Sequence, residues 1–207
     1  MRIKTLKNYC QTDTIAAIAT FPGPAGLGVI KISGKKSLAI AQKVVRFKTH
    51  KNLRAVNNFS IHYGWVLSPK TKQVVDEVLV SIMRGPNSYT RQDVVEISSH
   101  GGTAVVQEVL KAVVSAGARL ALPGEFTYRA FVSGRIDIFQ AQSVLNLSQA
   151  QTKQAVTAAC KQLQGQASKD IQEVRDTIKN LIVQLEAMLH FPEDVAEQDN
   201  KTFETSL

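Results

Sequence analysis

The first half of the chain alternates short apolar segments with turn-forming residues. Six segments are typical of β-strands, because they are short and either rich in β-branched residues or alternate apolar with polar positions. They cover residues 14–20, 29–33, 60–67, 74–83, 94–97 and 118–122. Glycines and prolines between residues 22 and 28 predict a loop. The sequence SPKTKQ predicts a hairpin between the third and fourth strands.

Two amphipathic segments lie among these strands and predict helices. A short one opens at Ser37 and continues through LAIAQKVV. A longer one spans residues 103–116, and Gly117 follows at the position of a helix C-cap. Its predicted apolar face consists of Val105, Val106, Val109, Leu110, Val113 and Val114. Strands mixed with helices predict an α+β domain.

The pattern changes after Pro123, because no further proline occurs until Pro192. A stretch rich in Gln and Ala begins near Val144, and a heptad pattern with spacings of 3, 4, 3, 4 and 3 follows. The heptad positions are Ile171, Val174, Ile178, Leu181, Leu185 and Met188. We therefore predict an α+β domain over residues 1–132 and a helical domain over residues 133–207.

The apolar stripe of the helical part is wider than one helix or hairpin hides completely. It packs on the α+β domain, or it needs a second chain or a missing segment of its own. An ordinary antiparallel helical hairpin is the simpler alternative. Beyond Pro192 the chain carries an acidic tail, with Glu193, Asp194, Glu197 and Asp199.

Composition narrows the class of protein. A chain of 207 residues with 44% hydrophobic and 20% charged residues is an ordinary globular mix, which excludes a wholly disordered chain. The two cysteines, Cys10 and Cys160, are too few and too far apart for a disulfide framework or a zinc site. Neither a secretory h-region nor a membrane-length apolar run is present. We expect a cytoplasmic protein that does not bind membranes.

Positive charge is concentrated at the front of the chain. Residues 1–60 hold eleven Lys or Arg and one acid, a balance of +10, whereas the remaining fourteen bases and sixteen acids give −2. Such an asymmetry indicates a polyanionic partner for the front, or merely a solvated basic face.

Two short motifs are similar to phosphate-binding loops. In GKKS, residues 34–37, five residues instead of four separate the glycine from Gly28, and Lys36 replaces the magnesium-binding hydroxyl. We therefore expect no nucleotide hydrolysis. HGG, residues 100–102, lies between a strand and a helix, where glycines admit a ligand and the helix N-terminus favours an anion. A tight strand-to-helix turn explains it equally well.

Three charged residues are candidates for a binding site. Glu96 lies within the apolar strand DVVEI, where a carboxylate either faces solvent or is held at a site. Lys31 has the same ambiguity in VIKIS. Arg135 follows Gly134 at the predicted domain boundary, and ligand pockets often form at such boundaries. The histidines are scattered, so no metal site is predicted.

Five segments together resemble the N-terminal region of the MnmE (TrmE) family of tRNA-modification GTPases. They are DTIAAIATFPGPAGLGVIKISG, GPNSYTRQDVVEISSHGG, LPGEFTYRAFVSGRIDIFQAQSV, LQGQASKDI and LHFPEDV. The resemblance runs from about residue 13 to residue 195. The PGEFTxRAF and HGG segments, in this order and spacing, are its most specific parts.

The resemblance implies an aminomethyltransferase-like domain that binds 5-formyltetrahydrofolate and forms a homodimer. A helical domain follows, and in the family a G domain is inserted into it. With a flavoprotein of the MnmG type, the whole protein modifies the wobble uridine of tRNA at C5, using GTP and potassium. This chain has no P-loop and no guanine-recognition motif. We therefore expect a fragment that lacks the G domain and does not hydrolyse GTP by itself.

The folate-contacting positions of the family correspond to Lys31, Glu96 and Arg135. A carboxylate accepts two hydrogen bonds from a pterin, and cations suit the formyl oxygen or the glutamate tail. Lys31 replaces the Arg usual in the family, and Arg135 replaces the usual Lys. The chain also has FPGPAG at residues 21–26 instead of PPGRGG, and TRQD at residues 90–93 instead of TGED.

Three functions remain open from the sequence. The first is the folate-binding and dimerisation module of a wobble-uridine tRNA-modification protein. The second is a stand-alone folate-dependent one-carbon or aminomethyl transferase, for which no catalytic nucleophile or base is identified. The third is a basic tRNA-binding remnant that uses residues 1–60.

Overall fold

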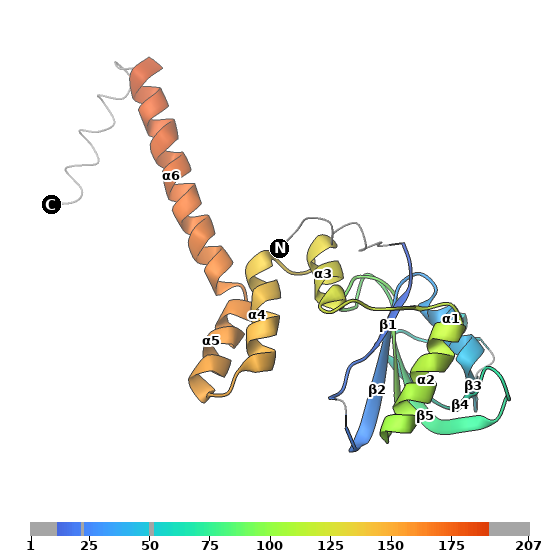
Figure 1. Ribbon diagram of the computed structural model, residues 1–207. Coiled ribbons are helices and arrows are strands. Elements are labelled where there is room, and N and C mark those ends of the chain that lie inside the picture. Colours follow the sequence, from blue (N-terminus) through green and yellow to red (C-terminus); the bar gives the residue numbers. More distant parts are fainter. Residues whose placement is uncertain (1–11, 22, 50–51, 191–207) are drawn as a thin grey trace. The chain divides into compact units, whose positions relative to one another are not determined.

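A computed structural model describes residues 12–21, 23–49 and 52–190 (Figure 1). Cys10 and the acidic residues beyond Pro192 lie outside this part. The chain forms two compact units that meet between Ile136 and Asp137, whereas the sequence-based boundary lies between residues 132 and 133. Residues 133–136 stay with the first unit because the amides of Arg135 and Ile136 both donate to the carbonyl of Ala130.

The first unit is built on one seven-stranded sheet with the order β3-β4-β5-β6-β2-β1-β7. All neighbours are antiparallel except β1 and β7, which run parallel. The strands are β1 (Ile15–Ile18), β2 (Ala25–Ser33), β3 (Val45–Phe47), β4 (Ser60–Leu67), β5 (Val74–Met83), β6 (Val94–Gly101) and β7 (Arg119–Leu120). The predicted β4–β5 hairpin is present.

Two helices, α1 (Ser37–Val44) and α2 (Thr103–Ser115), cover one face of this sheet (Figure 1). Alternation along the strands turns Ile30, Val80 and Ile97 toward the helices, and all three are fully buried. On α2, Val106, Val109, Ala112 and Val113 form the buried side. This mixed sheet with helices on one face confirms the predicted α+β class, and the opposite face of the sheet remains uncovered by α1 and α2.

The strands β2 and β6 are longer than predicted. The predicted loop over residues 22–28 gives way to β2 at Ala25, and β6 continues past Ile97 to Gly101. The reason is their mutual pairing, which extends to Ala25 opposite Gly101. Only a residue without a Cβ fits there, because a Cβ on Gly101 would lie 2.2 Å from the carbonyl oxygen of Ala25.

Three short elements were not predicted, namely β3, the 3-10 helix η2 (Leu53–Ala55) and the helix α3 (Glu125–Val132). The strand β3 takes Val45 from the end of the predicted first helix, because Val45 pairs with Val66 on β4. The helix α3 follows Gly124, whose φ of 74° ends the extended segment before it. It contains all of the PGEFTxRAF motif except Pro123 and Gly124, which precede it.

The second unit consists of α4 (Ile138–Gln149), α5 (Lys153–Leu163) and α6 (Gln166–His190). Asp137 and Gln140 form a capping box at the start of α4, and the side-chain Nε2 of Gln140 donates to the carbonyl of Leu163 at 2.9 Å. The hydroxyl of Ser168 donates to Asp137 at 2.6 Å. These bonds join the three helices, and the three helices confirm the predicted helical character.

The heptad positions all lie on α6, as their spacing predicts. Within the described part of the second unit five of them remain uncovered: Ile171, Val174, Ile178, Leu181 and Leu185 are 52%, 60%, 52%, 53% and 60% exposed. The simple hairpin therefore does not account for this stripe. Among the described residues, every helix is too short or too polar to cross a membrane.

Candidate functional site

Lys31 and Glu96 face each other on the side of the sheet that α1 and α2 leave uncovered. They are register partners on β2 and β6, and the distance from Lys31 Nζ to Glu96 Oε1 is 3.1 Å. Their side chains are 22% and 30% exposed. Each is flanked along its strand by core residues such as Ile30 and Ile97, so alternation places both on the uncovered face. The two predicted residues therefore form a half-buried ion pair.

Arg135 joins this pair through an aromatic ring. Lys31 Nζ lies 5.1 Å from the ring centroid of Tyr89, and Arg135 Cζ lies 4.9 Å from the same centroid. Phe126 supplies a second ring, 5.9 Å from Lys31 Nζ. Two of the three charged residues predicted from the sequence thus share one tyrosine ring, and Glu96 joins them through its ion pair with Lys31. Cation–π contacts of this kind hold both cations in defined positions.

Tyr89 and Phe126 were not singled out from the sequence. Tyr89 lies in the turn GPNSYTRQD, and Phe126 lies at the start of α3, so neither belongs to a predicted element. The available signal was their position inside two of the segments that resemble the family, GPNSYTRQDVVEISSHGG and LPGEFTYRAFVSGRIDIFQAQSV.

The turn that presents Tyr89 is tied to β2. Arg91 N donates to the Ser88 carbonyl at 3.3 Å, which closes the turn around Tyr89 and Thr90. Thr90 is fully buried, and its hydroxyl lies 2.7 Å from that of Ser33. Since Ser33 is two residues beyond Lys31 on the same face of β2, the turn and the ion pair share one rigid support.

A buried ionic network lies next to this support. Arg129 donates to Glu125 at 2.9 Å, and Arg119 donates to the same carboxylate at 2.7 and 3.1 Å. Asp13 accepts from Arg119 at 2.6 Å and also from Arg129. The side chains of Glu125 and Arg129 are 0% and 2% exposed. The network joins the segment before β1 to β7 and α3.

Gln92 connects the network to the Tyr89 turn. Its side-chain oxygen accepts from Arg129 Nη1 at 3.1 Å and from the Ser33 hydroxyl at 3.0 Å. Two residues of the PGEFTxRAF motif therefore serve the site indirectly: Glu125 and Arg129 hold α3 in place, and α3 presents Phe126, which belongs to the same motif. We expect these two residues to determine stability first and binding only through the geometry of the site.

The carboxyl group of Glu125 is ionised at neutral pH. Burial on its own would raise its pKa, but hydrogen bonds from Arg119, the Leu122 amide and Arg129 outweigh burial and hold the pKa below the usual 4.5. The pKa of Asp13 is likewise lowered, because bonds from Arg119 and Arg129 outweigh burial. Neither group is a general acid at neutral pH.

These lowered pKa values predict acid sensitivity of the first unit. A folded-state pKa below the unfolded value contributes stability that is complete above the unfolded pKa and is lost as the pH falls through the folded pKa. We expect the urea midpoint of Trp65 fluorescence to fall steadily below about pH 4.5. The Glu125→Gln variant is less stable at pH 7 but should show a shallower fall. An unchanged slope in that variant would exclude Glu125 as a cause.

The HGG segment is explained by contacts within the chain. His100 Nδ1 lies 2.7 Å from Asp76 Oδ1, and the His100 amide donates to Asp76 Oδ2 at 2.7 Å. The hydrogen bond to Asp76 also raises the pKa of His100. Gly101 admits the backbone of Ala25, and α2 starts directly after Gly102. The group that approaches Gly101 closely is therefore the backbone of β2, and not a ligand.

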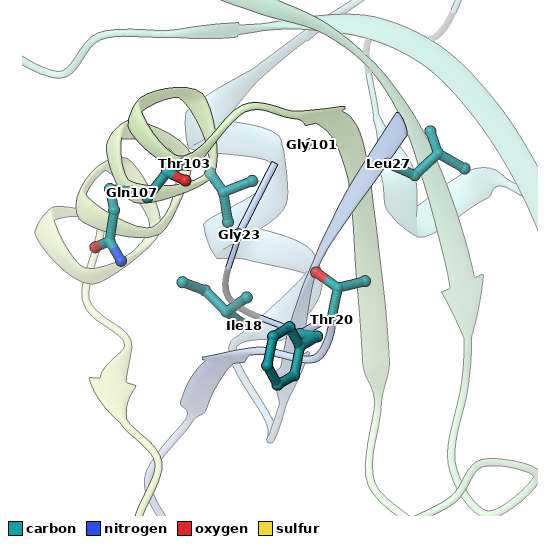
Figure 2. Close-up of a pocket in the computed structure, with 9 residues that line it drawn as sticks. Ile18, Thr20, Gly23, Leu27, Gly101, Thr103 and Gln107 are labelled. Carbon is teal, nitrogen blue, oxygen red and sulfur yellow. The ribbon is translucent and has the colours of Figure 1, made fainter. Parts of the chain in front are cut away.

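A small pocket lies between β1, the start of β2 and α2 (Figure 2). Ile18, Leu27, Gly101, Thr103 and Gln107 are among the residues that line it. Its volume of about 30 Å³ is close to that of one water molecule in the liquid, and far below the roughly 300–1,000 Å³ of pockets for small organic ligands. We therefore place the candidate site at Tyr89 and not in this pocket.

The chemistry of the Tyr89 site suits a flat, polar, negatively charged ligand. Glu96 accepts hydrogen bonds, two aromatic rings offer stacking surfaces, and Lys31 and Arg135 supply positive charge. In the described ranges no three His, Cys, Asp or Glu side chains are grouped as metal ligands. The side chains present thus offer contacts that an organic anion could use.

Comparisons with known proteins agree with this division of the chain. The family model described as "GTP-binding protein TrmE N-terminus" matches residues 14–135, and the one described as "MnmE helical domain" matches residues 138–207. The first match covers the whole candidate site, and the second begins at α4.

Several curated proteins are similar along most of the chain. The tRNA modification GTPase MnmE of Thermoanaerobacter pseudethanolicus is 48% identical over 190 residues, which is 91% of this chain and 41% of the relative. The MnmE proteins of Alkaliphilus oremlandii and Enterococcus faecalis are 46% and 45% identical, over 90% and 91% of this chain and 40% and 41% of theirs. The chain spans about two fifths of these relatives. It belongs to the TrmE/MnmE family, whose N-terminal and helical domains it contains.

Proposed function

We propose that this chain supplies the folate-binding module of a protein that modifies the wobble uridine of tRNA. The observation that carries the proposal is that Lys31 and Arg135 lie over the Tyr89 ring while Glu96 pairs with Lys31, since this brings together residues from β2, β6 and the segment after α3. The relatives are named tRNA modification GTPases, which supports the biological setting.

5-Formyltetrahydrofolate matches the chemistry of these side chains. The carboxylate of Glu96 would accept hydrogen bonds from the amide and amino groups of the pterin. The rings of Tyr89 and Phe126 would lie against the flat heterocycle. Lys31 and Arg135 would face the formyl oxygen and the glutamate carboxylates. GTP and potassium belong, in this proposal, to a full-length relative.

The ion pair between Lys31 and Glu96 has a consequence for binding. With Lys31 Nζ at 3.1 Å, Glu96 is already engaged, so a ligand competes with Lys31 for the carboxylate. A half-buried pair of this kind contributes modestly to stability, because its charges remain partly solvated. Replacing Lys31 by a ligand group at Glu96 therefore costs little free energy, which suits reversible binding.

Isothermal titration of the chain with 5-formyltetrahydrofolate tests the proposal. We expect saturable binding, and we expect Glu96→Ala to weaken it about 10- to 100-fold, the effect of removing a charged hydrogen-bond acceptor. Glu108→Ala is the matched control, because Glu108 is an exposed acid on α2 that pairs with Lys111. Unchanged affinity in Glu96→Ala would show that the ligand binds elsewhere.

The partners are part of the proposal as well. We include homodimerisation through the first unit, a flavoprotein of the MnmG type and tRNA. Support for a second copy comes from Ile61 and Leu79, which are 66% and 48% exposed on the sheet face that α1 and α2 do not cover. Sedimentation at micromolar concentration, where a monomer would contradict dimerisation, tests this part.

One observation favours RNA binding as a second function. At the β3 edge, Arg46 Cζ lies 5.3 Å from the Trp65 ring and Lys48 Nζ lies 5.7 Å from the Tyr63 ring. Both cations are exposed, and rings combined with cations on an open sheet suit unstacked bases. Phosphate contacts predict a steep fall of tRNA affinity with salt, whereas a flat dependence would remove this function.

A further inference from the structure

The turn beside the candidate site contains an arginine in a backbone conformation that suits glycine. Arg91 has a φ of 58°, in the left-handed region, where a side chain is disfavoured by contact between its Cβ and the backbone. Lys72, in the β4–β5 turn, has a similar φ of 59°. Strain alone is therefore not specific to the site, and the position of the Arg91 side chain is what distinguishes it.

The guanidinium of Arg91 reaches across to the segment that carries Arg135. Its Nη1 donates to the Ser133 carbonyl at 3.0 Å, and it lies beside Gly134, where an added Cβ would be 3.7 Å away. The next residue is Arg135, whose guanidinium lies over Tyr89. Both arginines are exposed. Two guanidinium groups are thus anchored at one turn, on the rim of the Tyr89 site.

The carboxylate of Asp93, in the same turn, is directed to the Gly85 amide and not to Arg91 or Arg135. Asp93 accepts from the Gly85 amide at 3.1 Å, and the side chain of Gln92 is directed to Ser33 and Arg129. Each guanidinium offers a planar fork that matches one carboxylate. The rim is therefore suited to a ligand with several carboxylates in series.

We propose that Arg91, together with Arg135, binds the γ-linked glutamate tail of a polyglutamylated folate. This inference rests on the proposed folate function, and it adds the form of the ligand. A folate with one glutamate carries two carboxylates at the end of its aminobenzoyl arm, and each further glutamate adds one. Arg135 meets the first glutamate beside Tyr89, and Arg91 meets the next ones at Ser133.

Titration with the mono- and triglutamate forms of 5-formyltetrahydrofolate tests the proposal on the full chain. We expect the triglutamate to bind about tenfold more tightly, and we expect Arg91→Gly to abolish this gain while leaving monoglutamate affinity unchanged. Glycine relieves the positive φ, so the urea midpoint of the variant should not fall. Lys72→Gly is the matched control, because it removes the same charge and the same strain at the opposite end of β5.

Each outcome separates this inference from the proposed function. Equal affinities for the mono- and triglutamate forms would overturn the binding of the glutamate tail by Arg91, but they would not contradict the proposed folate site. If Arg91→Gly loses binding of the monoglutamate, Arg91 lies at the pterin, and the assignment of Arg91 to the glutamate tail is overturned as well. An equal loss of the gain in Lys72→Gly shows general charge attraction instead of a site. If neither ligand binds the unaltered chain, the proposed function fails and the inference fails with it.

Discussion

Glu125→Ala is expected to lower the free energy of unfolding of the first unit by about 3–5 kcal/mol, the cost of leaving a buried charge without its partner. The carboxylate is fully buried and accepts from Arg119, Arg129 and the Leu122 amide. Its removal leaves Arg129, which is 2% exposed, with one fewer anion to compensate its charge. The helix α3 would lose its anchor to the segment before β1 and to β7.

Urea unfolding followed by Trp65 fluorescence measures this effect, since Trp65 is the single tryptophan and lies in β4. Glu108→Ala is the control, because it breaks an exposed pair with Lys111, and such pairs contribute about 0–1 kcal/mol. A loss below about 1 kcal/mol in Glu125→Ala would mean that water or a neighbouring side chain replaces the carboxylate.

Gly101→Ala is expected to cost about 3 kcal/mol, at the upper end of the range for overpacked sites. The added Cβ would lie 2.2 Å from the Ala25 oxygen and 2.6 Å from its carbonyl carbon. These are backbone atoms of a paired strand, so relief requires β2 to move away from β6. The same urea experiment detects the loss of stability.

Gly102→Ala is the matched control in the neighbouring position. Its nearest contact would be 3.7 Å, to a Val105 methyl group, and its φ of −62° suits any residue. We expect a change within about 1 kcal/mol, the range for an N-cap exchange. If Gly101→Ala and Gly102→Ala lowered stability equally little, the pairing of β2 with β6 would not explain why a glycine stands at position 101.

The sequence predicted most of the secondary structure of the first unit because alternation and helical periodicity are local. The bounds of β4 and β5 follow their alternating pattern, and α2 follows its valines. The prediction was wrong where pairing between distant segments decided the outcome. Ala25 lies in a run of turn-forming residues, yet it pairs with Gly101, 76 residues later.

The candidate site was also predictable only in part from the sequence. Lys31, Glu96 and Arg135 could be chosen from the sequence because their segments resemble a known family, and strand alternation already allowed the first two to share a face. That Lys31 and Arg135 share the Tyr89 ring could not be foreseen, since it depends on a turn held to β2 by Thr90 and Ser33.

By itself the sequence determined the fold class, the helical second part and the family, because each is written in local patterns and in motif order. Only the tertiary structure decided that Glu125 and Arg129 are a buried ion pair and that Arg91 lies on the rim of the site. Burial and charge pairing are properties of segments far apart in the chain, and they exist only once those segments are packed together.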